Sequence, residues 1–174
     1  MENCVAVPVC RALRDYIVST TGSTLIHPAK TSVIWAVVKQ YLICYTERQA
    51  ELRRHGPEDP QECIYIGLLQ ASSCKTYSRM SHNIISINTD CRQFLSFKGQ
   101  RVIARLLNNE FAKTYLDYMA GATANNPELN IKDIISNFCD QYSLDFPSVY
   151  EMLKKRWYRF RAQPRQLQNS LINF

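Results

Sequence analysis

Hydrophobic residues recur every three or four positions along most of the chain, a period that predicts a predominantly helical protein. The first such segment covers residues 8–19, with Leu13, Tyr16 and Ile17 on one face. Residues 20–23 follow as a polar stretch with a central glycine, which is typical of a helix stop. We therefore expect a short amphipathic helix followed by a turn.

A second helical pattern covers residues 33–45 and is rich in β-branched side chains. Its spacing of three and four outweighs the strand preference of those residues, so we predict a well-buried helix. An extension of this helix through the charged segment 47–54 is left open. Residues 55–60 contain two prolines and a glycine and must end it.

The pattern changes after this point, because residues 62–69 and 84–87 form two compact apolar runs. Both runs are typical of strands, and we predict an antiparallel hairpin between them. The connecting segment 71–83 is long for a hairpin loop and carries Lys75, Tyr77, Arg79 and His82. We favour a solvated connection over a functional finger, since loops are polar for solvation alone.

The final third of the chain is helical throughout. Its first helix is predicted over residues 96–121, ending at Gly121, which can adopt the left-handed conformation that closes many helices. The next is predicted over residues 131–142, with Asn130 as the N-cap.

Pro147 biases the residue before it away from helix, and Ser148 with Glu151 matches a capping box. A last helix is therefore predicted to begin at Val149. Two short helices joined by a tight turn and preceded by a longer helix are the arrangement of a tri-helical helix-turn-helix module.

The expected fold class is α+β and predominantly helical. Residues 1–95 should form an N-terminal part with two helices and a small antiparallel β-hairpin, and residues 96–162 a C-terminal lobe of the helix-turn-helix type. Residues 163–174 have too few apolar side chains to fold alone. We expect this tail to be flexible or docked on a partner through Leu167, Leu171 and Phe174.

Positive charge is concentrated near the C-terminus. The chain has 21 Lys and Arg against 15 Asp and Glu, and its last 23 residues hold six of the cations and no acid. Around the last helix, Val149, Leu153 and Phe160 share a narrow apolar sector flanked by Met152 and Trp157, which we expect to be core. The predicted nucleic-acid contacts are Lys154, Lys155, Tyr158, Arg159, Arg161 and Arg165.

The basic face of the last helix suits contact with phosphates better than reading of bases. In the first two turns of the helix, this face carries no Asn, Gln or Arg. A solvated terminal helix is the bland alternative, since cations near a helix C-terminus are favourable in any case. The pattern leaves open whether the face serves DNA, RNA or an acidic protein. Arg156 falls on the apolar side, where we expect it to emerge at the core edge or to meet Asp140 or Asp145.

Little in the sequence indicates catalysis. No glycine-rich phosphate loop or nucleophile elbow is present, and the histidines lie in polar contexts. Seven irregularly spaced cysteines suit reduced thiols in a cytosol and offer no paired metal-ligand spacing. We therefore expect no enzyme, no cofactor, no metal and no small-molecule substrate. The apolar runs are too short and too interrupted for a membrane span, so we expect a cytoplasmic protein.

A diffuse likeness accompanies these patterns. The motifs that carry it are Leu13-Arg14-Asp15-Tyr16, Gly22-Ser23, Trp35, Phe94-Leu95-Ser96, Gly99-Gln100 and the run Leu153 to Arg161. With these the chain resembles small uncharacterised proteins of bacteriophages and of mobile elements in gut bacteria. The resemblance implies a bacterial or phage-encoded setting and a duty related to DNA.

Two functional hypotheses follow. The first is a DNA-binding accessory or regulatory protein that grips the phosphates of double-stranded DNA through its basic C-terminal helix. The alternative is a non-catalytic assembly or virion protein that associates with itself and binds an acidic partner through its basic tail.

Overall fold

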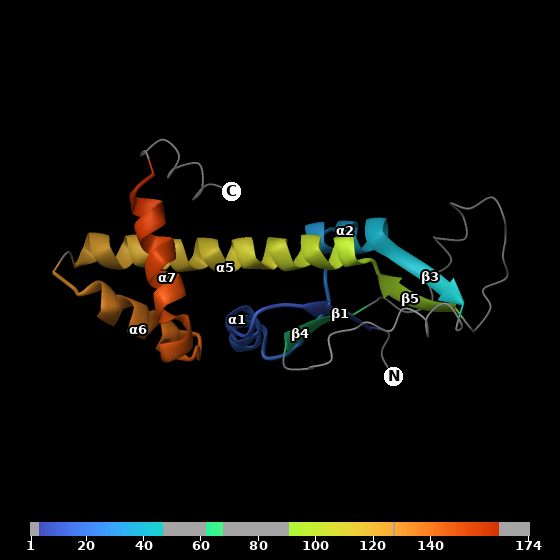
Figure 1. The fold of residues 1–174 in the computed structure, drawn as a ribbon, viewed down its shortest axis with the longest axis horizontal. Coiled ribbons are helices and arrows are strands. Elements are labelled where there is room, and N and C mark those ends of the chain that lie inside the picture. The colour runs from blue at the N-terminus through green and yellow to red at the C-terminus, as the bar shows by residue number, and fades with distance from the viewer. Residues whose placement is uncertain (1–3, 47–61, 68–90, 127, 164–174) are drawn as a thin grey trace. The chain divides into compact units, whose positions relative to one another are not determined.

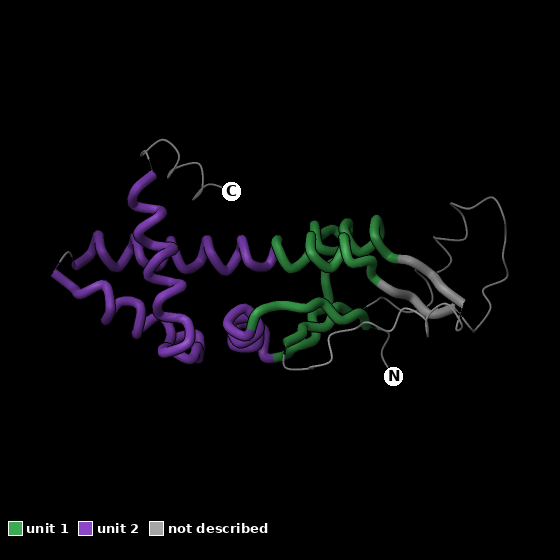
Figure 2. Tube along the Cα trace, viewed as in Figure 1, with its two compact units in different colours: residues 1–10, 23–105 green, residues 11–22, 106–174 purple. Residues whose placement is uncertain are grey.

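The computed structural model describes residues 4–46, 62–67, 91–126 and 128–163. The fold is α+β and mostly helical, as the sequence predicted, and its small sheet has three strands where a two-stranded hairpin was expected. The chain forms two compact units (Figure 2): Met1–Cys10 with Ser23–Arg105, here unit 1, and Arg11–Gly22 with Leu106–Phe174, here unit 2. These units do not follow the residue ranges that we expected from the sequence, because an early helix joins the C-terminal unit.

The three-stranded sheet lies in unit 1 and consists of β1 (Cys4–Pro8), β2 (Leu25–Ile26) and β4 (Cys63–Gly67). β4 is central, antiparallel to β1 and parallel to β2. The predicted strand at 62–69 is therefore present, whereas its predicted hairpin partner at 84–87 lies outside the described residues. β1 was not predicted, and Pro8, the expected first residue of a helix, ends this strand instead.

A second sheet of unit 1 pairs β3 (Leu42–Thr46) with β5 (Cys91–Leu95) in antiparallel register, with Leu42 opposite Leu95. It follows α2 (Val33–Tyr41), whose N-cap Ser32 accepts a hydrogen bond of 3.1 Å from the Trp35 amide. The helix predicted over 33–45 is thus too long. The chain turns extended at Leu42 because the distant segment 91–95 offers a strand partner, and the extension considered over 47–54 lies outside the described residues.

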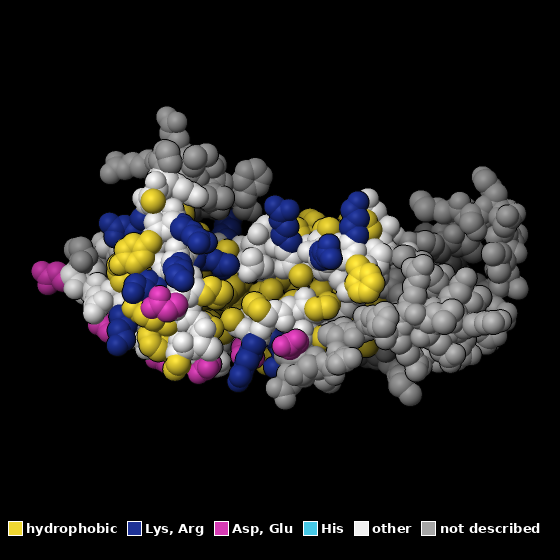
Figure 3. All heavy atoms as spheres, viewed as in Figure 1, with side chains coloured by type: hydrophobic (Ala, Val, Ile, Leu, Met, Phe, Trp, Pro, Cys, Tyr) yellow, Lys and Arg dark blue, Asp and Glu magenta, His cyan; other side chains and the backbone are white. Residues whose placement is uncertain are grey.

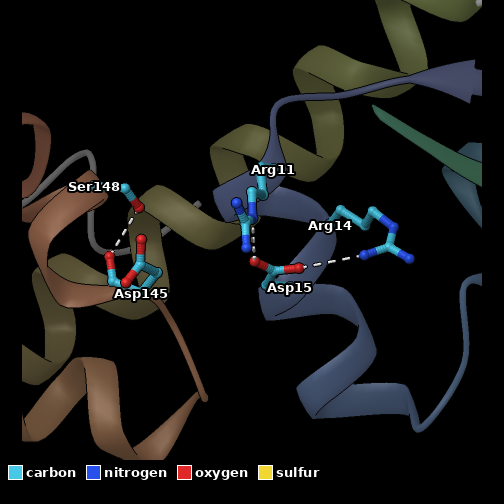
Figure 4. A network of polar contacts seen from close by, with 5 residues as sticks. All are labelled: Arg11, Arg14, Asp15, Asp145 and Ser148. Atoms are coloured by element: carbon cyan, nitrogen blue, oxygen red, sulfur yellow. Dashed lines mark hydrogen bonds and ion pairs between the residues drawn. The ribbon is translucent and has the colours of Figure 1, made fainter. Parts of the chain in front are cut away.

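Unit 2 contains α1 (Arg11–Thr21), which ends where the sequence predicted a stop. Gly22 has a φ of 74° and its amide donates to the Val18 carbonyl at 2.8 Å. In the first turns, the guanidinium groups of Arg11 and Arg14 lie 3.7 and 3.4 Å from the carboxylate of Asp15 (Figure 4).

Three helices complete unit 2: the second part of α5 (Phe97–Asn125), α6 (Ile131–Gln141) and α7 (Phe146–Arg161), which crosses α5 in Figure 1. Asn130 caps α6 as predicted, because its Oδ1 accepts from the Lys132 amide at 3.0 Å. The predicted end of α5 at Gly121 is wrong. Gly121 lies inside the helix, which continues to Asn125.

Aromatic rings from α1, from α5 and from α6 with its C-cap Tyr142 meet in the core of unit 2. Phe138 of α6 packs edge-on against Tyr115 of α5, with ring centroids 5.1 Å apart. The Tyr16 ring of α1 packs on Phe111 at 4.8 Å and on Tyr142 at 5.1 Å. Helical period alone identified the buried faces, but it did not indicate that α1 and α5 would share one core.

The connection between α6 and α7 is a tight turn closed by backbone hydrogen bonds. Ser143 adopts a φ of 53°, and the Leu144 amide donates to the Cys139 carbonyl at 2.8 Å. The predicted capping box is wrong, since α7 begins at Phe146 with Asp145 at the cap. The Ser148 hydroxyl donates instead to the Asp145 backbone carbonyl at 2.8 Å (Figure 4), which leaves Pro147 in the first turn, where it needs no amide partner.

Candidate nucleic-acid interface

The inner face of α7 is held firmly in unit 2. Val149, Leu153, Trp157 and Phe160 are all buried, which confirms the apolar sector predicted for this helix. Met152, predicted to flank that sector, is 37% exposed and lies outside the core. Four anchoring side chains on consecutive turns fix which way the rest of the helix faces.

The outer face of α7 carries Lys155, Tyr158, Arg159 and Arg161, and all four are exposed. Tyr158 is 49% exposed, which is a large value for an aromatic residue on a helix whose opposite face is buried. In Figure 3, dark blue Lys and Arg side chains gather where α7 lies in Figure 1. The structure therefore displays together most of the residues that the sequence proposed as nucleic-acid contacts.

Lys154 differs from the other predicted contacts. Its Nζ lies 3.8 Å from the Glu151 carboxylate and 5.3 Å from the centre of the Tyr150 ring. Its side chain is 37% exposed. Lys154 is thus partly engaged within α7 itself, so less of its charge is available to an external anion than that of Lys155.

Arg156 packs inward against α5. Its Nη2 donates to Asn108 Oδ1 at 3.4 Å, and its guanidinium carbon lies 5.6 Å from the centre of the Phe111 ring. The side chain therefore contributes to the junction of α5 and α7, where a cation over an aromatic face is favourable.

Two titratable groups beneath this face are shifted by burial. Burial raises the pKa of the Cys139 thiol to about 11, and the nearby carboxylates of Asp140 and Asp145 act in the same direction. Burial also raises the pKa of Tyr115 above its ordinary value, with Cys139 adding to the effect. Both side chains stay protonated near neutral pH, and both are fully buried in the core of unit 2.

Other features of the described chain bear on ligand classes. Among the residues in 4–46, 62–67, 91–126 and 128–163, His, Cys, Asp and Glu form no cluster that would hold a metal ion. In the same part of the chain, no helix is both long and apolar enough to span a bilayer. Four predicted site residues lie outside the described residues: Arg165, Leu167, Leu171 and Phe174. The segment 71–83 also lies outside them.

Comparison of the chain with models of protein families, with curated proteins and with solved structures finds no match. The candidate interface therefore has to be judged on its own geometry and charge.

Proposed function

We propose that this protein binds double-stranded DNA by its phosphates, through the outward face of α7. The observation that carries the proposal is the separation of the two faces of this helix. Leu153 and Phe160 are buried on one side, while Lys155 and Arg159 are exposed on the other. No acidic residue follows Glu151 along the chain. Cations presented in this way displace the counterions of a polyanion, which favours binding.

Helix stability alone does not account for the arrangement. Arg159 and Arg161 lie in the last turn of α7, where cations interact favourably with the helix dipole. Lys155 lies in the middle of the helix, beyond the reach of that effect, and Tyr158 gains nothing from it. The position of these two residues supports contact with a ligand.

The proposed binding is by backbone contact rather than by base reading. α6, the turn at Ser143 and α7 follow one another as in a helix-turn-helix module, in which the last helix enters a major groove. On the exposed side, the first two turns of α7 offer Ser148, Glu151 and Met152, and they carry no Arg, Lys, Asn or Gln, the side chains that make bidentate contacts to base edges. We therefore propose modest sequence preference, as suits an accessory or regulatory protein.

A fluorescence anisotropy titration of the protein with a random duplex tests the proposal. Charge reversal in Lys155→Glu/Arg159→Glu should abolish binding, whereas reversal at two other exposed cations, Lys30→Glu/Lys132→Glu, should weaken it far less. The logarithm of the affinity should fall with the logarithm of salt by about 0.9 for each phosphate contact. Equal binding by the α7 variant and the wild type would contradict the proposed binding of DNA through α7.

An assembly role is the second candidate. The order β1-β4-β2 leaves β1 (Cys4–Pro8) at an edge of the sheet, and an edge strand can pair with another chain. This observation supports self-association, as in a virion or other assembly protein, with the basic helix holding an acidic neighbour. Light scattering separates the two functions. A large stable oligomer without affinity for duplex DNA would favour assembly.

A further inference from the structure

A second basic surface lies on the first turns of α5, in unit 1. Lys98, Arg101 and Arg105 are spaced three and four residues apart, so they lie on one face of the helix, and all three are exposed. Seven residues separate the first from the last, which places them along about 10 Å of the helix axis. None of the three was among the contacts predicted from the sequence, which lie on the last helix and in the tail.

Phe97 belongs to the same face. It precedes Arg101 by four residues, so the two side chains are neighbours on the helix surface, and 62% of Phe97 is exposed. Ile103 is fully buried and Leu107 nearly so, which fixes the opposite side of this part of α5 against the protein. The exposed face of α5 therefore points away from these two buried residues.

The glycine in this segment serves packing. A Cβ on Gly99 would lie 2.5 Å from the Tyr41 Cβ and 2.9 Å from the Leu95 Cδ1, so only glycine lets α5 approach the end of α2 this closely. The Ser96 amide also donates to the Tyr41 carbonyl at 3.1 Å, and the Lys98 Nζ lies 5.7 Å from the centre of the Tyr41 ring. These contacts orient the basic face.

Lys98 occupies a position that is unfavourable for the stability of α5. The first turn of α5 carries Lys98 and no acidic residue, although the positive end of a helix dipole favours anions. No acid occurs from Phe97 to Asn109. Over its full sequence, unit 1 has eleven Lys and Arg against seven Asp and Glu. The dipole disfavours Lys98 alone, so the support for an anionic ligand is the exposure of all three cations together with the absence of acids beside them.

We propose that this face of α5, formed by Phe97, Lys98, Arg101 and Arg105, binds single-stranded nucleic acid. The three cations contact successive phosphates, and an unpaired base stacks on the Phe97 ring. A single strand is the favoured ligand because the bases of a duplex are already stacked and leave no free face for the ring. This binding is separate from that proposed for α7 and does not depend on it.

Anisotropy titrations of the full chain with a labelled oligothymidylate of about 20 nucleotides test this inference. Phe97→Leu keeps an apolar side chain but removes the ring, and should weaken binding roughly 5- to 150-fold, as the loss of one stacked base does. Phe97→Tyr keeps the ring and should bind as the wild type does. Val33→Ala truncates another exposed apolar residue of unit 1 and serves as the matched control.

The charged part of the surface is tested by its salt dependence. Arg101→Gln/Arg105→Gln should lower the slope of log affinity against log salt by about 1.4, since each lost contact to a single strand removes about 0.7. The variant Lys155→Glu/Arg159→Glu should retain oligothymidylate binding. Absence of binding by the wild type, or unchanged binding by both α5 variants, would overturn the inference. An equal loss on duplex and single strand would overturn the single-strand assignment.

Discussion

The Tyr115 hydroxyl of α5 donates a hydrogen bond of 3.0 Å to the backbone carbonyl of Leu153, in the middle of α7. Both residues are fully buried. This bond joins α5 to α7, and together with the four buried side chains of α7 it fixes the rotation of that helix about its axis. The exposure of Lys155 and Arg159 therefore depends on a contact that neither residue makes.

Tyr115→Phe should lower the free energy of unfolding by about 1 kcal/mol, because a buried neutral hydrogen bond is lost without a cavity. Urea denaturation followed by circular dichroism measures the change. Tyr118→Phe is the matched control, since its ring packs on Phe138 one turn further along α5. A loss of the same size in both variants would argue against a special role for the bond to Leu153.

Ser143→Gly should stabilise the protein by roughly 0.5–1 kcal/mol. Ser143 has a φ of 53°, where a side chain costs about 1–2 kcal/mol, and the greater backbone entropy of glycine in the unfolded chain offsets part of the gain. Ser143→Val, with a β-branched side chain at the same φ, should destabilise it. Thermal unfolding of the three proteins provides the test, and a more stable valine variant would contradict this account of the turn.

Two glycines of α5 should respond in opposite directions to replacement by alanine. Gly99→Ala places a Cβ 2.5 Å from Tyr41 and should cost roughly 1–3 kcal/mol through overpacking. At Gly121 nothing lies within 4 Å of the added Cβ, so Gly121→Ala should gain up to about 1 kcal/mol from helix propensity. Chemical denaturation of both variants measures the two signs. Stabilisation by Gly99→Ala would show that α2 and α5 are not in close contact there.

Lys154 and Lys155 should contribute unequally to duplex binding. Lys154 lies 3.8 Å from the Glu151 carboxylate, whereas Lys155 is exposed on the outer face. Lys155→Gln should therefore weaken binding more than Lys154→Gln does, and it alone should lower the salt slope by about 0.9. Anisotropy titrations over a range of salt concentrations make the comparison. A larger effect at Lys154 would place the ligand on a different side of α7.

Stability should fall in the alkaline range because of Cys139. Its pKa is about 11 in the folded protein against 9.0 ordinarily, so its thiol stabilises the fold fully below pH 9. As the pH rises from 9 to 11, the unfolded chain loses this proton while the folded protein keeps it, and the free energy of unfolding decreases. Cys139→Ala removes the effect.

The measurement is the difference in unfolding free energy between wild type and Cys139→Ala as a function of pH. This difference cancels the titration of other groups. The unfolding free energy of the wild type, relative to that of Cys139→Ala, should be constant below pH 9 and should decrease from pH 9 to 11. A constant difference over the whole range would show that the thiol is not held in its protonated form.

The candidate site was predictable in its composition but not in its detail. The apolar sector of α7 and the identity of its outward cations follow from helical period. Side chains three or four residues apart share a face of a helix with 3.6 residues per turn. The engagement of Lys154 with Glu151 and the inward packing of Arg156 depend on rotamers and on α5. The start of α7 at Phe146 also escaped prediction, since Asp145 and Ser148 are both residue types that favour an N-cap.

What the amino-acid sequence determined by itself is local: the helical faces, the cap at Asn130, the stop at Gly22 and the strand at β4 all depend on residues close in the chain. Tertiary structure alone decided the rest. Leu42 leaves the helical pattern because β5 offers it a strand partner, and α1 joins unit 2 because Tyr16 packs on Phe111 and Tyr142. Such pairings join segments far apart in sequence, and no local period encodes which distant segment will supply the partner.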